Sequence, residues 1–330
     1  MEFGKRRYLK YILVSVIAVL LIAAILLGVV ILDKKHGFFP EHEQEERILE
    51  YGGDKYVLKD GVETFLVLGL DKYEENISAD SYNNNQQADF LMLMVFDNKE
   101  KTYSTIHINR DTVTEIEVLG VAGNKVGTVN KQIALAHTYG KSAAVSNSNT
   151  AKAVSKLFYG VKVDHYMSLT LDSIGVMNDL VGGIELEVLD DFSDVEGGEA
   201  LVFGETVQLS AEQAQLYIQH RKELSDSSNA TRMKRQQQYL EAMRAKIENR
   251  VQTDNEFLAE AVIKMSDYME SDCSSTRLQE IGNKMRDYEF VEINDVEGES
   301  IIGNNERMEF YPDEDSLKRL VIDLFYTPEK

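Results

Sequence analysis

The chain has 330 residues and a formal net charge of −21, from 56 acidic and 35 basic side chains. This length is enough for one sizeable domain with an addition, or for two modest domains. A strongly acidic protein lacks the basic face that phosphate backbones require, so the composition excludes nucleic acid as a partner. The single cysteine, Cys273, excludes an internal disulfide, and we expect it to be a packed thiol rather than a nucleophile.

The first predicted element is a transmembrane helix over residues 11–32, which carry no charge. At a rise of 1.5 Å per residue, such a helix crosses a hydrocarbon core of about 30 Å. The basic residues before it are Lys5, Arg6, Arg7 and Lys10. This excess predicts a cytoplasmic N-terminus, residues 1–10. A cleaved signal peptide is the alternative, but the apolar run is too long and no small-x-small cleavage site follows it. We therefore expect a single-pass protein of the cell membrane with an extracellular C-terminal domain.

Residues 33–60 are polar and charge-rich, and we predict a spacer or short helix that leaves the membrane. The first strand follows at residues 65–70, an unbroken apolar run that Asp71 closes. Continuous apolarity without alternation is typical of a strand covered on both faces, as in a mixed or parallel sheet. Residues 72–87 then form a long polar loop, which is usually functional or mobile when it occurs inside a compact domain.

A β-hairpin is predicted over residues 90–96 and 102–108, which are apolar and β-branched runs joined by a polar turn. If the turn is centred near residues 98–100, the numbers of facing residues sum to about 199. Asp89 and Arg110 then lie side by side at the open end of the hairpin, with Asp111 next to them.

A third charged residue, Asp71 at the end of the first strand, is also expected near this pair. If the strand at residues 65–70 runs parallel to residues 102–108, its carboxyl end places Asp71 beside Arg110. Sheets of this kind usually carry their sites beyond the carboxyl ends of strands. The alternative is that Asp71 and Asp89 only bound strands and that Arg110 makes a structural ion pair. Periodicity alone leaves both interpretations open.

The rest of the chain alternates between predicted helices and strands. Helices are predicted over residues 130–139, 150–159, 172–181, 210–222, 230–249, 257–268, 277–285 and 316–325, and extended segments over residues 113–118, 164–169, 184–189 and 288–293. Asp172 is the expected cap of its helix, and Ser210 with Gln213 forms a capping box. In the strand at residues 184–189, Glu185 and Glu187 alternate with apolar residues, which predicts a solvated sheet face.

A polar loop at residues 223–229 separates two of these helices and has basic side chains at both ends. Arg221 lies near the end of the first helix, and Arg232, Lys234 and Arg235 lie in the first turn of the second. Cations at a helix N-terminus oppose the macrodipole, so an anion there would compensate them. Arginine suits phosphate because its planar guanidinium bridges two oxygens. A solvated basic stripe is the alternative.

Several enzyme classes have no support in the sequence. The chain contains no HExxH, GxSxG, GxGxxG or CxxC signature, and its six histidines are scattered. A zinc centre or a Ser–His–Asp site is therefore not expected. Gly140-Lys141-Ser142 is not a phosphate-binding loop, because Leu135 stands where the required earlier glycine would be.

A series of short motifs resembles a known family. The series is an LxLGxD strand end at residues 66–71, the RDT of residues 110–112, IALAHTYG at residues 133–140, VGGIEL at residues 181–186, YIQHR at residues 217–221 and NATRMKRQQ at residues 229–237. In this order behind an N-terminal anchor, they resemble the LytR–CpsA–Psr family of cell-envelope proteins. The similarity covers roughly residues 61–245.

The resemblance implies both a fold and an activity. Members of the family have an αβα sandwich, so we expect an α/β fold around a mixed central sheet at residues 61–249. A mostly helical C-terminal extension, residues 250–330, would follow as a structural appendage. The family is associated with the transfer of glycopolymers, such as teichoic acids, from a polyprenyl-pyrophosphate carrier to peptidoglycan. The resemblance thus implies a membrane-anchored phosphotransferase of cell wall biogenesis.

The resemblance also assigns roles to residues. Asp71 and Asp89 match the carboxylates that hold Mg²⁺ near the pyrophosphate, and Asp89 is also the expected base, with Arg110 as its catalytic partner. The residues that match pyrophosphate-binding positions are Arg110, Arg221, Arg232 and Gln236, with Arg235 adjacent. The apolar strand and the helices after it would form the walls of a pocket for the lipid tail.

Three positions depart from the family pattern. Gln87 and Gln219 stand where the pattern has arginine, and Asn109 stands where it has proline. Two lost cations weaken stabilisation of a phosphoryl-transfer transition state. A non-catalytic polyprenyl-phosphate-binding protein of the envelope is therefore the alternative function. An effect on transcription, which the family's historical name as an attenuator suggests, would be indirect.

Overall fold

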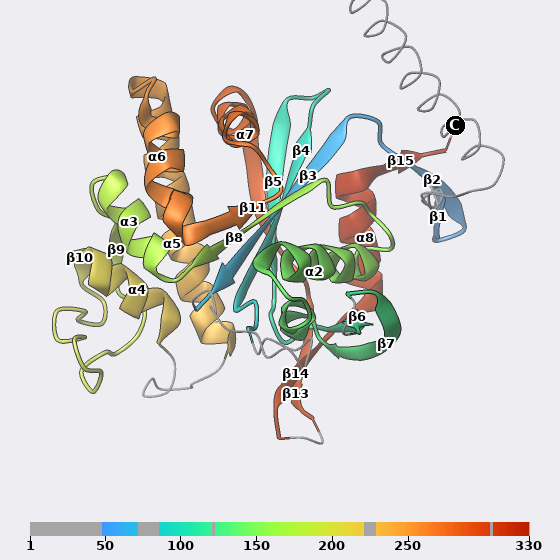
Figure 1. Cartoon of the computed structure of the whole chain (residues 1–330), viewed down its shortest axis with the longest axis horizontal. Helices are drawn as coiled ribbons and strands as arrows, with labels where there is room; N and C mark the ends of the chain where they lie inside the picture. The colour runs from blue at the N-terminus through green and yellow to red at the C-terminus, as the bar shows by residue number, and fades with distance from the viewer. Residues whose placement is uncertain (1–47, 72–85, 121–122, 221–228, 304–305, 330) are drawn as a thin grey trace, which may run out of the picture. The chain divides into compact units, whose positions relative to one another are not determined.

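A six-stranded mixed sheet lies at the centre of the computed structural model, in the order β11-β8-β3-β4-β5-β12 (Figure 1). Its strands are β3 (Val62–Leu70), β4 (Phe90–Asp97), β5 (Thr102–Ile108), β8 (His165–Thr170), β11 (Met269–Ser271) and β12 (Glu289–Asp295). β4 pairs antiparallel with both β3 and β5. β8 lies parallel to β3, β12 lies parallel to β5, and β11 runs antiparallel to β8. The prediction of a mixed sheet is therefore confirmed.

The structure describes residues 48–71, 86–120, 123–220, 229–303 and 306–329. Residues from Ile48 onward belong to one compact unit. No helix in these ranges is long and apolar enough to cross a membrane. The predicted transmembrane anchor at residues 11–32 lies outside the described residues.

Helices cover both faces of the sheet, and the alternation of side chains along β3 shows how (Figure 1). Leu66 and Leu68 belong to a buried cluster with α2 (Ala143–Leu157) and α8 (Glu314–Phe325). Phe65 and Val67 point to the opposite face and cluster with Ile281 of α7 (Ser275–Asp287). Both faces of β3 are thus buried, as its continuous apolar sequence predicts.

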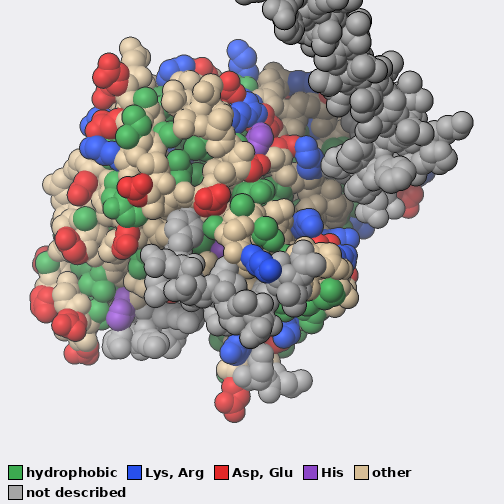
Figure 2. All heavy atoms as spheres, viewed as in Figure 1, with side chains coloured by type: hydrophobic (Ala, Val, Ile, Leu, Met, Phe, Trp, Pro, Cys, Tyr) green, Lys and Arg blue, Asp and Glu red, His purple; other side chains and the backbone are tan. Residues whose placement is uncertain are grey.

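A second buried cluster lies beside the sheet. It is built from α3 (Asp172–Leu180), α4 (Ala211–Gln219), α5 (Asn229–Thr253), α6 (Phe257–Met265) and the short hairpin of β9 (Glu185–Glu187) and β10 (Thr206–Gln208). Glu185 and Glu187 are exposed on β9, as predicted. Acidic side chains gather over α3, α4 and this hairpin in Figure 2.

Helix ends follow the local rules in one case and depart from them in another. Ser210 and Gln213 form both hydrogen bonds of the predicted capping box at the start of α4. Asp172, in contrast, is not the cap of α3. It is the first helical residue, and Leu171 occupies the cap position without a side-chain hydrogen bond. The acidic side chain still lies in the first turn, where the helix dipole favours it.

Two predicted segments have a different structure. Residues 48–58 are not a spacer, since β1 (Ile48–Tyr51) and β2 (Asp54–Leu58) form a three-stranded sheet with β15 (Tyr326–Pro328). Residues 130–132 are not helical, because they pair with β6 (Val113–Leu119) as the end of β7 (Lys125–Gln132). Only a short 3₁₀ helix, η1 (Ile133–Thr138), follows.

The C-terminal residues are not an appendage. α6, α7 and α8 are helices, as expected, but β11 and β12 form the two edges of the central sheet. The rest of this region consists of the 3₁₀ helix η2 (Ser266–Tyr268) and the hairpin of β13 (Gly298–Ile302) and β14 (Met308–Pro312). Pairing of β12 with β5 joins segments far apart in sequence, so no local pattern reveals it.

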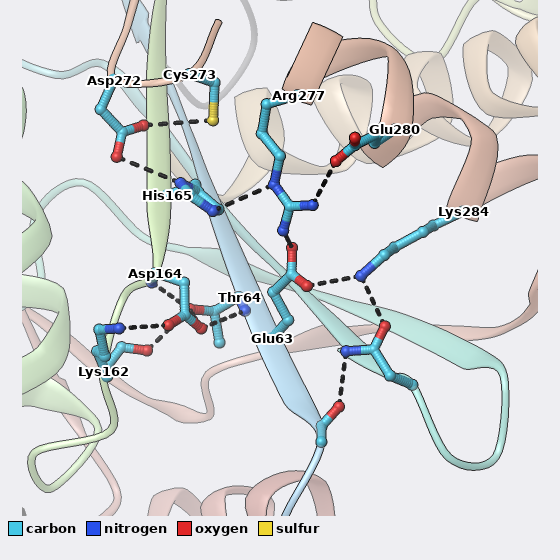
Figure 3. Close-up of polar contacts among 12 residues, drawn as sticks. Glu63, Thr64, Lys162, Asp164, His165, Asp272, Cys273, Arg277, Glu280 and Lys284 are labelled. Carbon is cyan, nitrogen blue, oxygen red and sulfur yellow. Dashed lines mark hydrogen bonds and ion pairs between the residues drawn. The ribbon is translucent and has the colours of Figure 1, made fainter.

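A network of ion pairs fixes α7 to the sheet (Figure 3). Glu63 of β3 accepts from Arg277 Nη2 through one carboxylate oxygen and from Lys284 Nζ through the other, each at 2.6 Å. Lys284 also donates to Asn98 Oδ1 at 2.7 Å, and the Tyr288 hydroxyl donates to the same oxygen at 2.9 Å. The Glu63 side chain is only 15% exposed, so these bonds are weakly screened by solvent.

We predict that Glu63→Gln lowers the free energy of unfolding by about 2 kcal/mol, because it removes two charge-assisted hydrogen bonds from a mostly buried carboxylate. Urea unfolding measures the change. Glu280→Gln is the matched control, since Glu280 makes a single bond to Arg277 and its side chain is 54% exposed. It should cost less than about 1 kcal/mol. Equal losses in the two variants would show that Glu63 does not fix α7.

Candidate active site

The register of the β4–β5 hairpin brings two predicted site residues together. Leu91 faces Ile108 and Phe96 faces Tyr103, so the numbers of facing residues sum to 199, as predicted. Asp89 and Arg110 lie two positions beyond the Leu91–Ile108 pair, and their side chains form an ion pair. The Arg110 side chain is only 14% exposed. This pair is the first component of the site.

Gln87 lies against the same arginine. Its Oε1 accepts a hydrogen bond from Arg110 Nη2. Asp111 Oδ1 lies 3.7 Å from Arg110 Nε on the other side. A second arginine at position 87 would place two cations in contact, whereas the neutral amide supplies an acceptor. Gln87 therefore orients Arg110 and adds no positive charge.

Backbone hydrogen bonds hold the strand ends that carry these residues. Ala88 N–H donates to Ala134 O, and Ala134 N–H donates to Arg110 O. The side chain of Asn109 accepts from the Asp111 N–H at 3.0 Å. This hydrogen bond fixes the backbone between the end of β5 and Asp111.

The IALAHTYG segment contributes a buried histidine, His137, that supports the site from the side of α2. The imidazole is fully buried. Its Nδ1 lies 3.0 Å from Gln86 O, and its Nε2 lies 3.0 Å from Asn147 Oδ1 of α2. Burial lowers the pKa of His137. The ring thus links α2 to the residue that precedes Gln87, and it positions the site without contacting the cavity.

A largely apolar cavity of about 330 Å³ begins beside Asp89. Strands β3, β4, β5, β8 and β12 and helices α3, α5 and α7 contribute to its walls. The polar or charged lining residues at one end are Asp71, Asp89, Gln219, Arg232 and Gln236. Asp71 and Gln219 are exposed, so the cavity opens to solvent at this end. We call these five residues the cavity mouth.

The structure corrects the predicted neighbour of Asp71. β3 and β5 run in the same direction, but β4 lies between them, so Asp71 is not the lateral neighbour of Arg110. It lies instead at the strand end next to Asp89, whose N–H donates to Gly69 O at 2.8 Å. Asp71 and Asp89 therefore line the same mouth, as a shared metal site requires.

α5 contributes two of the predicted anion-binding residues to the mouth. Arg232 is buried and its Nη2 lies 3.5 Å from Asp89 O. Gln236, one turn later, is also buried and donates to Ile218 O of α4 at 3.2 Å. Residues at positions i and i+4 share a helix face, which explains why both reach the cavity. Arg221 lies outside the described residues.

Arg235 does not reach the cavity. Its guanidinium is buried, pairs with Asp190 at 2.8 Å, and donates to the backbone oxygens of Tyr217 and His220. It also lies over the ring of Phe192, 5.3 Å from the centroid. These contacts join α5 to α4 and to the segment after β9. We therefore correct its predicted role from pyrophosphate binding to support of the cavity mouth.

His107 is a residue near the site that the sequence analysis did not single out. It is buried on β5, with its ring 5.1 Å from that of Phe90. Burial, and after it the positive charge of Arg232, lowers the pKa of His107 to about 4. The imidazole is therefore neutral near pH 7 and adds no further positive charge beside Arg232. A polar residue in a buried apolar strand was the only sequence signal for it.

One group of three potential metal ligands occurs among the described residues, namely His165, Asp272 and Cys273 (Figure 3). Arg277 Nε donates to His165 Nε2 at 3.4 Å, which places a guanidinium beside the imidazole. Burial, and after it the charge of Asp272, raises the pKa of Cys273 to about 11. A protonated thiol and a neighbouring cation both disfavour a metal, so we interpret the group as structural. Cys273 is not a reactive thiol.

Comparison with known proteins identifies the family. The sequence model of the LytR_cpsA_psr family matches residues 37–323. The protein therefore belongs to this family, as the motifs indicated. A solved structure of TagT bound to LI-WTA aligns with a TM-score of 0.60 and 19% identity, over 80% of this chain and 90% of that one. The mixed α/β fold is thus the fold of this family.

Two curated relatives carry functional names. "Polyisoprenyl-teichoic acid--peptidoglycan teichoic acid transferase TagU" of Halalkalibacterium halodurans is 27% identical over 180 residues, which are 54% of this chain and 51% of the relative. The TagV transferase of Bacillus subtilis, which bears the same functional name, is 29% identical over 162 residues, 48% of this chain and 38% of the relative. The chain thus spans about half, or less, of the curated relatives that it matches.

The lowered pKa of His107 predicts a pH dependence of stability. Between pH 6.5 and pH 4 the unfolded chain binds a proton at His107 that the folded chain does not bind. The free energy of unfolding should therefore fall as the pH drops through this window, by an amount on the order of 3 kcal/mol from this residue. Urea unfolding at several pH values measures the slope.

His107→Gln should remove this part of the slope, because glutamine does not titrate. Ser104→Ala is the control, since Ser104 lies on the same strand and carries no titratable group. It should leave the slope unchanged. If the wild-type protein and the His107→Gln variant had the same slope, His107 would not be held neutral by the fold.

Proposed function

We propose that this protein transfers a glycopolymer from a polyprenyl-pyrophosphate carrier to peptidoglycan. The observation that carries the proposal is an apolar cavity whose mouth contains two carboxylates and a buried arginine, Asp71, Asp89 and Arg232. The functional names of TagU and TagV support it, because both are named as teichoic acid–peptidoglycan transferases.

The two parts of the site match the two parts of such a carrier. A prenyl chain is hydrocarbon, and the cavity interior offers apolar side chains such as Met92, Met94 and Met167. A diphosphate is strongly anionic, and Arg232 at the mouth offers charge-assisted hydrogen bonds. The overall charge of −21 would repel a diphosphate elsewhere on the surface. The predicted anchor at residues 11–32 would keep the protein in the membrane that contains the carrier.

A divalent cation completes the proposed site. Asp71 and Asp89 supply hard carboxylate oxygens at one mouth, which is the donor set that suits Mg²⁺ beside phosphate oxygens. When bound, such an ion would neutralise negative charge on the diphosphate. Of the two carboxylates, Asp89 also forms the ion pair with Arg110.

The chemistry assigned to the chain is one displacement at phosphorus. A hydroxyl of the acceptor attacks the phosphorus that bears the glycan and forms a new P–O bond. The bond to the bridging oxygen breaks, and polyprenyl phosphate leaves with that oxygen. Asp89 accepts the hydroxyl proton, Arg232 stabilises the charge that develops on the phosphate oxygens, and Arg110 orients Asp89 through their ion pair. Gln236 helps to hold the mouth through its bond to α4.

A second function is favoured by one observation. Gln219 is exposed at the mouth, where the family pattern has arginine, and Gln87 occupies another arginine position. Each cation lost from a transition-state site typically costs a few kcal/mol of stabilisation. The alternative is therefore a protein that binds polyprenyl phosphate in the envelope without turnover.

We expect the full chain in detergent to release polyprenyl phosphate from a short polyprenyl-pyrophosphate saccharide, given Mg²⁺ and peptidoglycan fragments. Chromatography of the released lipid measures turnover. Asp89→Asn keeps the shape of the side chain but removes its charge, and it should reduce turnover by at least about a hundredfold. Lys234→Gln, an exposed substitution on the same helix turn as Arg232, should have no effect.

Thermal unfolding of each variant separates loss of activity from loss of fold. Chelation of the metal should also abolish release. Tight binding of the lipid without release, unchanged in the Asp89→Asn variant, would contradict transfer and establish the binding protein instead.

A further inference from the structure

The cavity has a second end, and α5 shows where it lies. Arg232 at the mouth and Arg244 both line the cavity, and twelve residues separate them along the helix. At the α-helical rise, their Cα atoms are about 18 Å apart. Arg244 therefore lies near the end of the cavity opposite to the diphosphate position, and of α5 only Ile247 lines the cavity further along.

A compact cluster of polar and aromatic groups occupies this second end. Arg244 lies over the ring of Phe290, with its guanidinium carbon 4.0 Å from the ring centroid. Its Nη1 donates to Glu248 Oε1 at 2.6 Å, and the Tyr103 hydroxyl donates to the same oxygen at 2.9 Å. The Tyr103 and Phe290 rings are 5.1 Å apart. We call these four residues the cavity floor.

The floor is held by the sheet and by the C-terminal helices. Tyr103 and Phe290 are direct neighbours in the parallel pairing of β5 with β12. Tyr103 is almost completely buried, and burial raises its pKa, so the hydroxyl remains a donor to Glu248. Met285 of α7, the helix that Glu63 fixes to β3, lines the adjacent wall. Three separate elements thus support the floor.

The chemistry of the floor differs from that of the walls. The walls between mouth and floor are mostly methionine, leucine and isoleucine side chains. A hydrocarbon chain gains free energy as it covers these walls, but it gains little by displacing a guanidinium from a carboxylate and an aromatic ring. A tail that reaches the floor meets polar groups, and the side chains of Arg244 and Glu248 there are each 27% exposed.

We propose that the floor, Tyr103, Arg244, Glu248 and Phe290, limits the number of isoprene units that the cavity covers, so that units beyond the floor add no affinity. This inference rests on the proposed function, since it takes a prenyl phosphate as the ligand. It assigns to β12, within the region expected to be an appendage, a direct part in binding the tail.

Binding of a series of prenyl phosphates to the full chain in detergent tests the floor. Isothermal titration with geranyl, farnesyl, geranylgeranyl and longer phosphates gives the dissociation constants. Each isoprene unit that enters the cavity should tighten binding at least about tenfold. Once the tail reaches the floor, a further unit should change the dissociation constant less than about twofold.

The chain length beyond which binding no longer tightens is the limit set by the floor. Variants at Phe290 should change this limit in opposite directions. Phe290→Ala removes the ring and should shift the limit one unit longer, whereas Phe290→Trp should shift it one unit shorter. Val291→Ala is the matched control, because Val291 is the next residue of β12 and its side chain is 56% exposed. It should leave the limit unchanged.

The outcomes separate this inference from the proposed function. Affinity that rises with every added unit in the wild type would contradict the proposed role of the floor, and so would a limit that neither Phe290 variant changes. Either result would leave prenyl phosphate binding intact. Absence of binding at every length would overturn the proposed function and the floor with it.

Discussion

The site depends on one constraint, the register of the β4–β5 hairpin. Residues on adjacent strands face each other in pairs, so a slip of one residue would turn every side chain to the opposite face of the sheet. The observed register sets Asp89 beside Arg110 and buries Leu91 and Leu93 in the core. The free energy of the buried leucines therefore also fixes the geometry of the charged pair. In this part of the chain, the same strand register therefore determines both the packing of the core and the assembly of the site.

Charge is distributed unevenly around the cavity mouth. The surface of the chain is strongly acidic, whereas Arg232 is buried at the cavity mouth and Arg110 is mostly buried beside it. Neutral groups surround these arginines where more cations would repel them, namely the amide of Gln87 and the neutral imidazole of His107. Arg235 contributes through structure instead, because its charge is satisfied by Asp190 and two backbone oxygens. Arg110, Arg232 and Arg235 thus have different partners, which their spacing does not reveal.

The sequence predicted those parts of the fold that local interactions decide. The hairpin register, the capping box at Ser210 and the two-sided burial of β3 follow from turn position, side-chain chemistry and apolar pattern, and all three are confirmed. The motif order predicted the family correctly. Within the site, the pairing of Asp89 with Arg110 followed from the hairpin alone.

The errors fall where distant segments decide the outcome. Residues 48–58 were predicted as a spacer, but β2 gains its second partner from the C-terminal β15. β12 was predicted as extended, yet its place beside β5 depends on a pairing that has no local signal. Arg235 was grouped with Arg232 because they are close in sequence. Residues three apart are neighbours on a helix surface, so spacing suggested a shared role, but Asp190 and the backbone oxygens of Tyr217 and His220 bind the Arg235 guanidinium.

A crystal structure of the protein with farnesyl diphosphate and Mg²⁺ tests the central claim most directly. The account predicts that the diphosphate lies at the mouth within hydrogen-bond distance of Arg232, with a metal ion between it and the carboxylates of Asp71 and Asp89. It also predicts that the prenyl chain lies in the cavity and points toward Phe290. A diphosphate bound elsewhere, or a chain that lies outside the cavity while the mouth stays empty, would contradict the account.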